Sequence, residues 1–225
     1  SLPVHTPFLF SRMLNKPQAL WSDALLLAAL FLLLALMPMA SAPLEYRREA
    51  ISAAQLWRVF TGHFVHLNMA HAAMNALGTL LVSLVFVREI SRPQWWCLVL
   101  AAPLTISLGL WIKQPELQGY VGFSGVLHAL LYLGVVRLLA TAPILAASIL
   151  LLLVSRQIWE QTSGYNPDYL RGVIHGRVMP DAHLFGGLTG MALGSFTLWR
   201  DYRAGRLGKD NSSGYSSKTG PTPDA

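Results

Sequence analysis

Apolar segments long enough to cross a lipid bilayer dominate this chain of 225 residues. They cover residues 20–40, 66–87, 95–112, 120–136, 138–155 and 182–199. A helix of about 20 residues, rising 1.5 Å per residue, crosses a hydrocarbon core of ~30 Å. The segments therefore predict an all-α polytopic membrane protein with six transmembrane helices.

The composition agrees with a membrane protein. Apolar residues make up 53% of the chain and charged residues only 12%, whereas soluble domains carry roughly 25% charge. The net charge of +6 does not indicate nucleic-acid binding, because the basic residues separate apolar runs instead of forming a block. Cys97 is the single cysteine, and we expect it to be a small buried hydrophobe. Without a cysteine cluster or a His-Glu-x-x-His motif, we predict neither a metal site nor another cofactor.

The apolar runs also indicate the domain organisation. We expect a cytoplasmic N-terminal segment at 1–19, a six-helix domain at 20–207, and a polar, disordered tail at 208–225. The first run is interpreted as a retained anchor helix, because further apolar runs follow it without a convincing cleavage site. With the N-terminus inside, ten of the 17 Lys and Arg residues lie on the cytoplasmic side. The positive-inside rule therefore favours cytoplasmic N- and C-termini.

Two loops on the predicted outer side are long. Residues 41–65 mix apolar and charged side chains, which is typical of a segment lying in the membrane interface. Residues 157–181 contain Gly164, Pro167, Gly172 and Gly176, which indicates a mobile flap before the last helix; we place Glu160 in this loop. We expect His63 and His175, one in each loop, to be solvated.

Polar residues gather where three of the apolar segments begin. These starts carry His66, Asn68, His71 and Asn75; Gly122, Ser124, Gly125 and His128; and His183. With six spans, the starts of the second, fourth and sixth helices face the same side of the membrane. Ionisable groups at membrane depth are costly and mark functional sites, so this side is where we expect the site.

Ser124 and His183 are the residue types of a minimal nucleophile–base pair. Each alone is weak evidence, because small residues near Ser124 often serve packing and a histidine can merely join two helices. From Gly186 to Gly194, however, a glycine recurs at every fourth position, and His183 lies on the same face. If this smooth face packs near Gly125, the imidazole and the serine hydroxyl come within hydrogen-bonding distance.

The remaining histidines have alternative interpretations. His71 and Asn75 share one helix face, so they either donate to an oxyanion or simply hold the bundle together. His66 is expected to shape the junction between loop and helix. His128 is an alternative base for Ser124, but it is the poorer one, because a side chain four residues later on the same helix points parallel to the serine.

Together these residues resemble the rhomboid family of intramembrane serine proteases. The resemblance covers about residues 20–199 and rests on Trp57-Arg58, His66, His71, Asn75, Gly122-x-Ser124-Gly125, and Ala182-His183 with Gly186 and Gly190. It implies a six-helix rhomboid-like bundle in which Ser124 is the nucleophile and His183 the general base.

The resemblance also assigns supporting roles. His71 and Asn75 complete the oxyanion hole, and Gly122, Gly125, Gly186 and His128 support the pair. The family implies a dyad without an acidic member, which agrees with our finding no Asp or Glu in the six apolar cores.

A subfamily resemblance is narrower. Many rhomboids have an aromatic residue four places after the serine, which stacks on the catalytic imidazole; here that residue is His128. The string Gly-Phe-Ser-Gly-Val-Leu-His, together with Thr61-Gly62-His63-Phe64 and Trp159-Glu160, resembles the bacterial rhombosortases. The resemblance to rhombosortases implies an inner-membrane enzyme with a periplasm-facing site. Its partners would be the lipid bilayer and exported proteins that end in a Gly-Gly motif, an apolar helix and a basic end.

Two other function classes compete with a protease. A non-catalytic rhomboid-like protein binds membrane helices but usually lacks the serine or the histidine. A transporter or channel places polar groups at several depths and on both sides, whereas here they gather on one side. If the chain is a protease, the sequence leaves open whether water or another amine takes the acyl group, which separates hydrolysis from transpeptidation.

Overall fold

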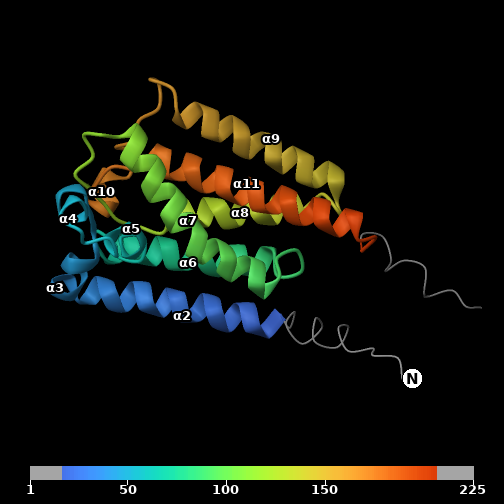
Figure 1. Cartoon of the computed structure of the whole chain (residues 1–225), viewed down its shortest axis with the longest axis horizontal. Coiled ribbons are helices and arrows are strands. Elements are labelled where there is room, and N and C mark those ends of the chain that lie inside the picture. Colours follow the sequence, from blue (N-terminus) through green and yellow to red (C-terminus); the bar gives the residue numbers. More distant parts are fainter. Residues whose placement is uncertain (1–16, 207–225) are drawn as a thin grey trace, which may run out of the picture.

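A computed structural model describes residues 17–206, and this part of the chain is mostly helical. Its long helices are α2 (Pro17–Leu36), α6 (Met69–Val85), α7 (Arg92–Lys113), α8 (Ser124–Leu138), α9 (Pro143–Glu160) and α11 (Pro180–Arg203). Short helices connect them: α3 (Pro38–Ser41), η1 (Ala42–Leu44), α4 (Arg48–Ser52), α5 (Arg58–Thr61) and α10 (Arg171–Ile174). The short α-helices gather at one end of the bundle, and α2 begins and α11 ends at the other (Figure 1).

The expected terminal segments fall mostly outside the described residues. Of the segment predicted at 1–19, only residues 17–19 are described, and they belong to α2 instead of preceding it. The tail predicted at 208–225 lies wholly outside. Disorder of that tail stays a prediction.

Two of the described helices, α7 and α9, are each long and apolar enough to cross a membrane. A third candidate is α2 taken together with the short helices after it, although the chain bends by 108° between them. Helices α6 and α8 are apolar but shorter. The structure thus supports a membrane protein, and the full count of six spans stays a prediction.

The structure extends α9 beyond its predicted end at residue 155. The helix starts at Pro143, in the first-turn position that proline favours, and continues to Glu160. Arg156 and Glu160 are one turn apart and form an ion pair, which favours helix over loop. Placing Glu160 in the outer loop was therefore wrong.

The glycine face of α11 packs directly on α8, as the sequence predicts. A Cβ atom added at Gly186 would overlap the carbonyl oxygen of Gly125, and one at Gly190 would overlap that of Ala129. Only glycine allows two helix backbones to come this close. Helix α8 also contacts α6, α7 and α9, so it lies at the centre of the bundle (Figure 1).

The segment after α3 is tied to the segment before α8. Strand β1 (Tyr46–Arg47) pairs antiparallel with β2 (Gly119–Tyr120), with Tyr46 opposite Tyr120. The Arg48 guanidinium donates to the Leu117 and Trp111 carbonyls at 3.1 and 2.9 Å. These bonds satisfy a carbonyl in the last turn of α7 and one in the loop after it, and they hold the chain that leads into α8.

Two sequence expectations about polar or reactive residues need correction. The Asp23 carboxylate is buried within α2 and binds the Arg92 guanidinium at 2.6 and 2.9 Å, so an acidic residue does lie in an apolar segment. Its cost is offset by this ion pair with the first residue of α7. Cys97, expected to be buried, is exposed on α7, as are Leu100 and Leu104 of the same helix.

Substitution of Gly190 by alanine tests the α8–α11 contact. The added methyl group would meet the Ala129 carbonyl, so the helices must separate, and we expect the free energy of unfolding to fall by about 3 kcal/mol. Unfolding of the detergent-solubilised protein measures it. The matched control is Gly172→Ala, because a Cβ at Gly172 has no neighbour within 4 Å. Equal stability of the two variants would contradict the close contact.

Candidate active site

Ser124 is the first residue of α8. The chain reaches it through Gly122, whose φ of +119° is a conformation that residues with a side chain rarely adopt. Tyr120 reinforces this turn, because its hydroxyl donates to the Gly122 carbonyl at 2.9 Å. Ser124 thus lies at the positive end of the α8 dipole, where the first amides lack helical partners.

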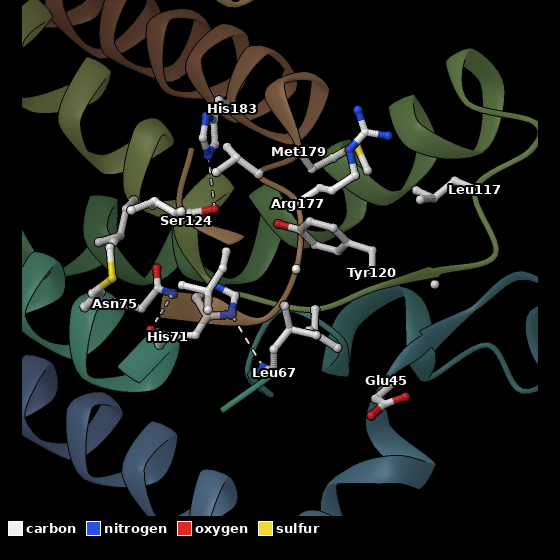
Figure 2. A pocket seen from close by; sticks show the side chains of 18 of the residues that line it. Glu45, Leu67, His71, Asn75, Leu117, Tyr120, Ser124, Arg177, Met179 and His183 are labelled. Carbon is white, nitrogen blue, oxygen red and sulfur yellow. Dashed lines mark hydrogen bonds between the residues drawn. The ribbon is translucent and has the colours of Figure 1, made fainter. Parts of the chain in front are cut away.

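His183 lies in the first turn of α11 and meets the serine. Its Nε2 atom is 3.2 Å from the Ser124 hydroxyl oxygen, and Figure 2 shows the two side chains pointing toward each other. Both belong to helices held together by the glycine face. The hydrogen-bonding distance that the sequence suggested is therefore observed.

Glu160 completes the surroundings of His183, and sequence reasoning missed it. Its Oε2 atom is 3.0 Å from His183 Nδ1, on the ring edge opposite Ser124. The expected absence of an acidic partner is thus wrong for this structure. The i, i+4 pair of Arg156 and Glu160 could have revealed the longer helix, but hydropathy falls at Arg156 and ended the predicted segment there.

His128 stacks on His183 instead of approaching the serine hydroxyl. The two rings are 4.0 Å apart at an interplanar angle of 12°. His128 Nδ1 is 2.8 Å from the backbone carbonyl of Ser124, and a carbonyl only accepts, so Nδ1 carries the proton. Of the two histidines, His183 has a ring nitrogen facing the Ser124 hydroxyl oxygen.

His71 and Asn75 are both buried on α6, on the side of the Ser124 turn. The amide of Leu67 lies 3.4 Å from His71 Nδ1, so the neutral ring carries its proton on Nε2. A Cβ added at Gly122 would lie 2.8 Å from that Nε2. Asn75 donates through Nδ2 to the His71 carbonyl at 3.1 Å and has a second amide hydrogen.

A cavity of about 770 Å³ joins these groups. Its lining includes Ser124, His183, His128, His71, Asn75 and Tyr120. Leu170 and Ile174, at either end of α10, also line it, and the Asn68 side chain holds this segment by donating to the Val173 carbonyl at 2.9 Å. The cavity is large enough for a peptide segment and water.

The remaining predicted histidines divide into buried and exposed ones. His63 was expected to be solvated but is fully buried, with Nε2 3.0 Å from the Ser107 hydroxyl. Its loop packs on α7, so a polar composition was a poor guide to exposure. His66 lies at the junction before α6, as predicted, and contacts the His71 ring edge-on. His175 is exposed, as predicted.

Comparison with known protein families identifies the family of the chain. The model of the rhomboid domain matches residues 53–200. The chain belongs to the rhomboid family. Rhomboid proteins are in general intramembrane serine proteases that act on transmembrane substrates. The matched residues include Ser124, His183, His71 and Asn75. No curated protein matches the chain.

The buried His63 gives this rhomboid a stability that depends on pH. Burial lowers the pKa of His63 to about 3, whereas an unfolded histidine titrates near 6.5. The unfolded chain therefore binds more protons between these values, and the free energy of unfolding falls as the pH drops below about 6.5. Between about pH 7 and pH 5, His63 alone accounts for a loss of about 2 kcal/mol.

A His63→Gln variant, unfolded at both pH values, should therefore lose less stability on acidification than the wild type. Burial also lowers the pKa of His66 to about 3, so the wild-type pH dependence contains more than one histidine. The difference in pH dependence between the wild type and His63→Gln gives the contribution of His63. The exposed His175, changed to Gln, is the control. An unchanged slope in His63→Gln would refute the assignment.

Proposed function

We propose that this rhomboid is an intramembrane serine endopeptidase with Ser124 as nucleophile and His183 as general base. The observation that carries the proposal is the 3.2 Å approach of Ser124 Oγ to His183 Nε2 inside a cavity of peptide size. In a rhomboid domain, a serine and a histidine so placed have the geometry that acyl transfer requires.

In the proposed reaction, His183 Nε2 takes the hydroxyl proton as Ser124 attacks the scissile carbonyl. The same proton then passes to the leaving amine, and the peptide bond breaks to give an acyl-enzyme. Water attacks this ester in the second half, with His183 again as base. The open cavity supplies that water.

The developing oxyanion requires donors close to Ser124. We assign this role to the first-turn amides of α8, the His71 Nε2–H and the Asn75 side-chain amide. Their support is the position of His71 beside Gly122 and the burial of both side chains on the cavity wall. Gly122 is needed because a side chain there would displace the His71 ring.

We further propose that the six long helices all span a bacterial inner membrane, with the site facing the periplasm. Support comes from the excess of Lys and Arg in the segments then placed inside. Helix α8 has 15 residues, which is about 22 Å and shorter than the ~30 Å hydrocarbon core. A span that begins below the outer surface places Ser124 within the membrane but still open to water through the cavity.

The proposed substrates are membrane-anchored exported proteins of the rhombosortase type. A transmembrane helix must unwind before its backbone reaches Ser124, and glycine lowers the cost of unwinding. A C-terminal Gly-Gly before an apolar helix meets this need. The subfamily assignment rests on His128, Thr61-Gly62-His63-Phe64 and Trp159-Glu160.

Labelling with a fluorophosphonate probe tests the catalytic assignment. We expect the wild-type protein to be labelled and Ser124→Ala to be unlabelled, because only an activated serine reacts. His183→Ala should lose at least about 10²-fold in the rate of labelling. The exposed Ser148 and His175, each changed to Ala, are matched controls that should label like the wild type.

The other outcomes separate the alternatives. Equal labelling of all variants would refute the assignment of Ser124 as nucleophile and His183 as base. Loss in His128→Ala with retained labelling in His183→Ala would make His128 the base. A wild-type protein that binds membrane helices without labelling or cleaving them would be the non-catalytic rhomboid-like protein.

A second experiment tests the substrate class. In proteoliposomes, a fusion protein ending in Gly-Gly, an apolar helix and a basic end should be cleaved near the glycines, and a Leu-Leu version should be cleaved at least about tenfold more slowly, because it resists unwinding. Mass spectrometry of the new C-terminus distinguishes the two reactions, because hydrolysis leaves a free acid and transpeptidation leaves an amide. Equal cleavage of both fusions would contradict the requirement for glycine.

A further inference from the structure

Glu160 is a buried carboxylate placed against the catalytic imidazole. It is the last residue of α9, and its side chain is 2% exposed. Its Oε2 lies 3.0 Å from His183 Nδ1, on the opposite ring edge from the Nε2 that faces Ser124. The His183 ring therefore connects Ser124 to Glu160, with one ring nitrogen facing each of them. The three residues come from three different helices, α8, α11 and α9.

This contact determines where the imidazole proton lies. A carboxylate only accepts hydrogen bonds, so the proton of the neutral ring must be on Nδ1. Nε2 is then unprotonated and can accept from the Ser124 hydroxyl, which is what a general base requires. Without Glu160, the opposite tautomer becomes available, with a proton on Nε2 and no base toward the serine.

The carboxylate is held in its charged form by its own surroundings. Glu160 Oε1 binds the Arg156 guanidinium at 2.9 Å, and arginine stays cationic at any physiological pH. Gln157 Nε2 lies 3.4 Å from Oε2. Arg156 is half-exposed and lies over the Tyr165 ring, so the counter-charge is anchored while its outer side reaches water.

We propose that Glu160 is the positioning residue of a Ser124–His183–Glu160 triad, with Arg156 as its counter-ion. The inference rests on the proposed protease function and adds an acidic member to the pair. Glu160 orients the ring, selects the productive tautomer and stabilises the imidazolium that forms when His183 takes the serine proton. It touches neither the substrate nor the serine, so its effect should appear in kcat and not in KM.

The triad is tested by comparing the kcat and KM of full-length variants for cleavage of the Gly-Gly fusion protein in proteoliposomes. Glu160→Gln keeps the shape but not the charge, and we expect kcat to fall by about 10²- to 10⁴-fold with little change in KM. Glu160→Asp keeps the carboxylate and should recover a large part of that loss. The control is Glu49→Gln, an exposed residue of α4, which should match the wild type. Full kcat in Glu160→Gln, or equal loss in Glu160→Asp and Glu160→Gln, would overturn the proposal.

A measurement on the wild-type protein keeps the proposal testable if Glu160→Gln does not fold. In protein labelled with ¹⁵N-histidine, the His183 signal, identified by its absence from His183→Ala, should report the Nδ1–H tautomer with a strongly hydrogen-bonded proton. An Nε2–H tautomer would overturn the triad. The proposed function fails in a different way: wild-type protein then neither cleaves its substrate nor labels at Ser124, whatever the tautomer of His183.

Discussion

The backbone contact between α8 and α11 is the constraint on which the site depends. Gly186 and Gly190 leave no space for a side chain against the carbonyls of Gly125 and Ala129. This approach brings the first turns of two helices together, one beginning at Ser124 and the other carrying the His183 imidazole. Two side chains that are far apart in sequence, Ser124 and His183, meet because nothing larger than hydrogen lies between the helices that hold them.

The turn before Ser124 is held in place by a second set of contacts. The β1–β2 pair and the hydroxyl of Tyr120 hold the segment that ends at Gly122. Burial raises the pKa of the Tyr120 phenol, so that group stays protonated and continues to donate. The serine is therefore preorganised from two directions, by helix packing below it and by the loop above it.

Much of the site was predictable because it depends on local spacing. The sequence alone shows a glycine at every fourth position with His183 on the same helix face. It also shows Ser124 between two glycines. Glu160 was missed because hydropathy measures the average of a window, and the charged Arg156 ended the predicted segment one turn too early. His63 was misjudged because loop composition says nothing about what packs on the loop. The approach of Glu160 to His183 and the burial of His63 against α7 both depend on contacts between distant segments, which a single sequence does not show.

The helix that carries Glu160 is the least closely packed of the six long helices in the described chain. Helix α9 touches mainly α8 and α11, and most of its apolar side chains face outward. Ser124 and His183 sit on the most tightly packed pair, so they keep their mutual distance when α9 shifts. Movement of this one helix would therefore withdraw the carboxylate from a pair that is otherwise complete. In the proposed enzyme, the position of this peripheral helix would then set the activity while the central bundle stays unchanged.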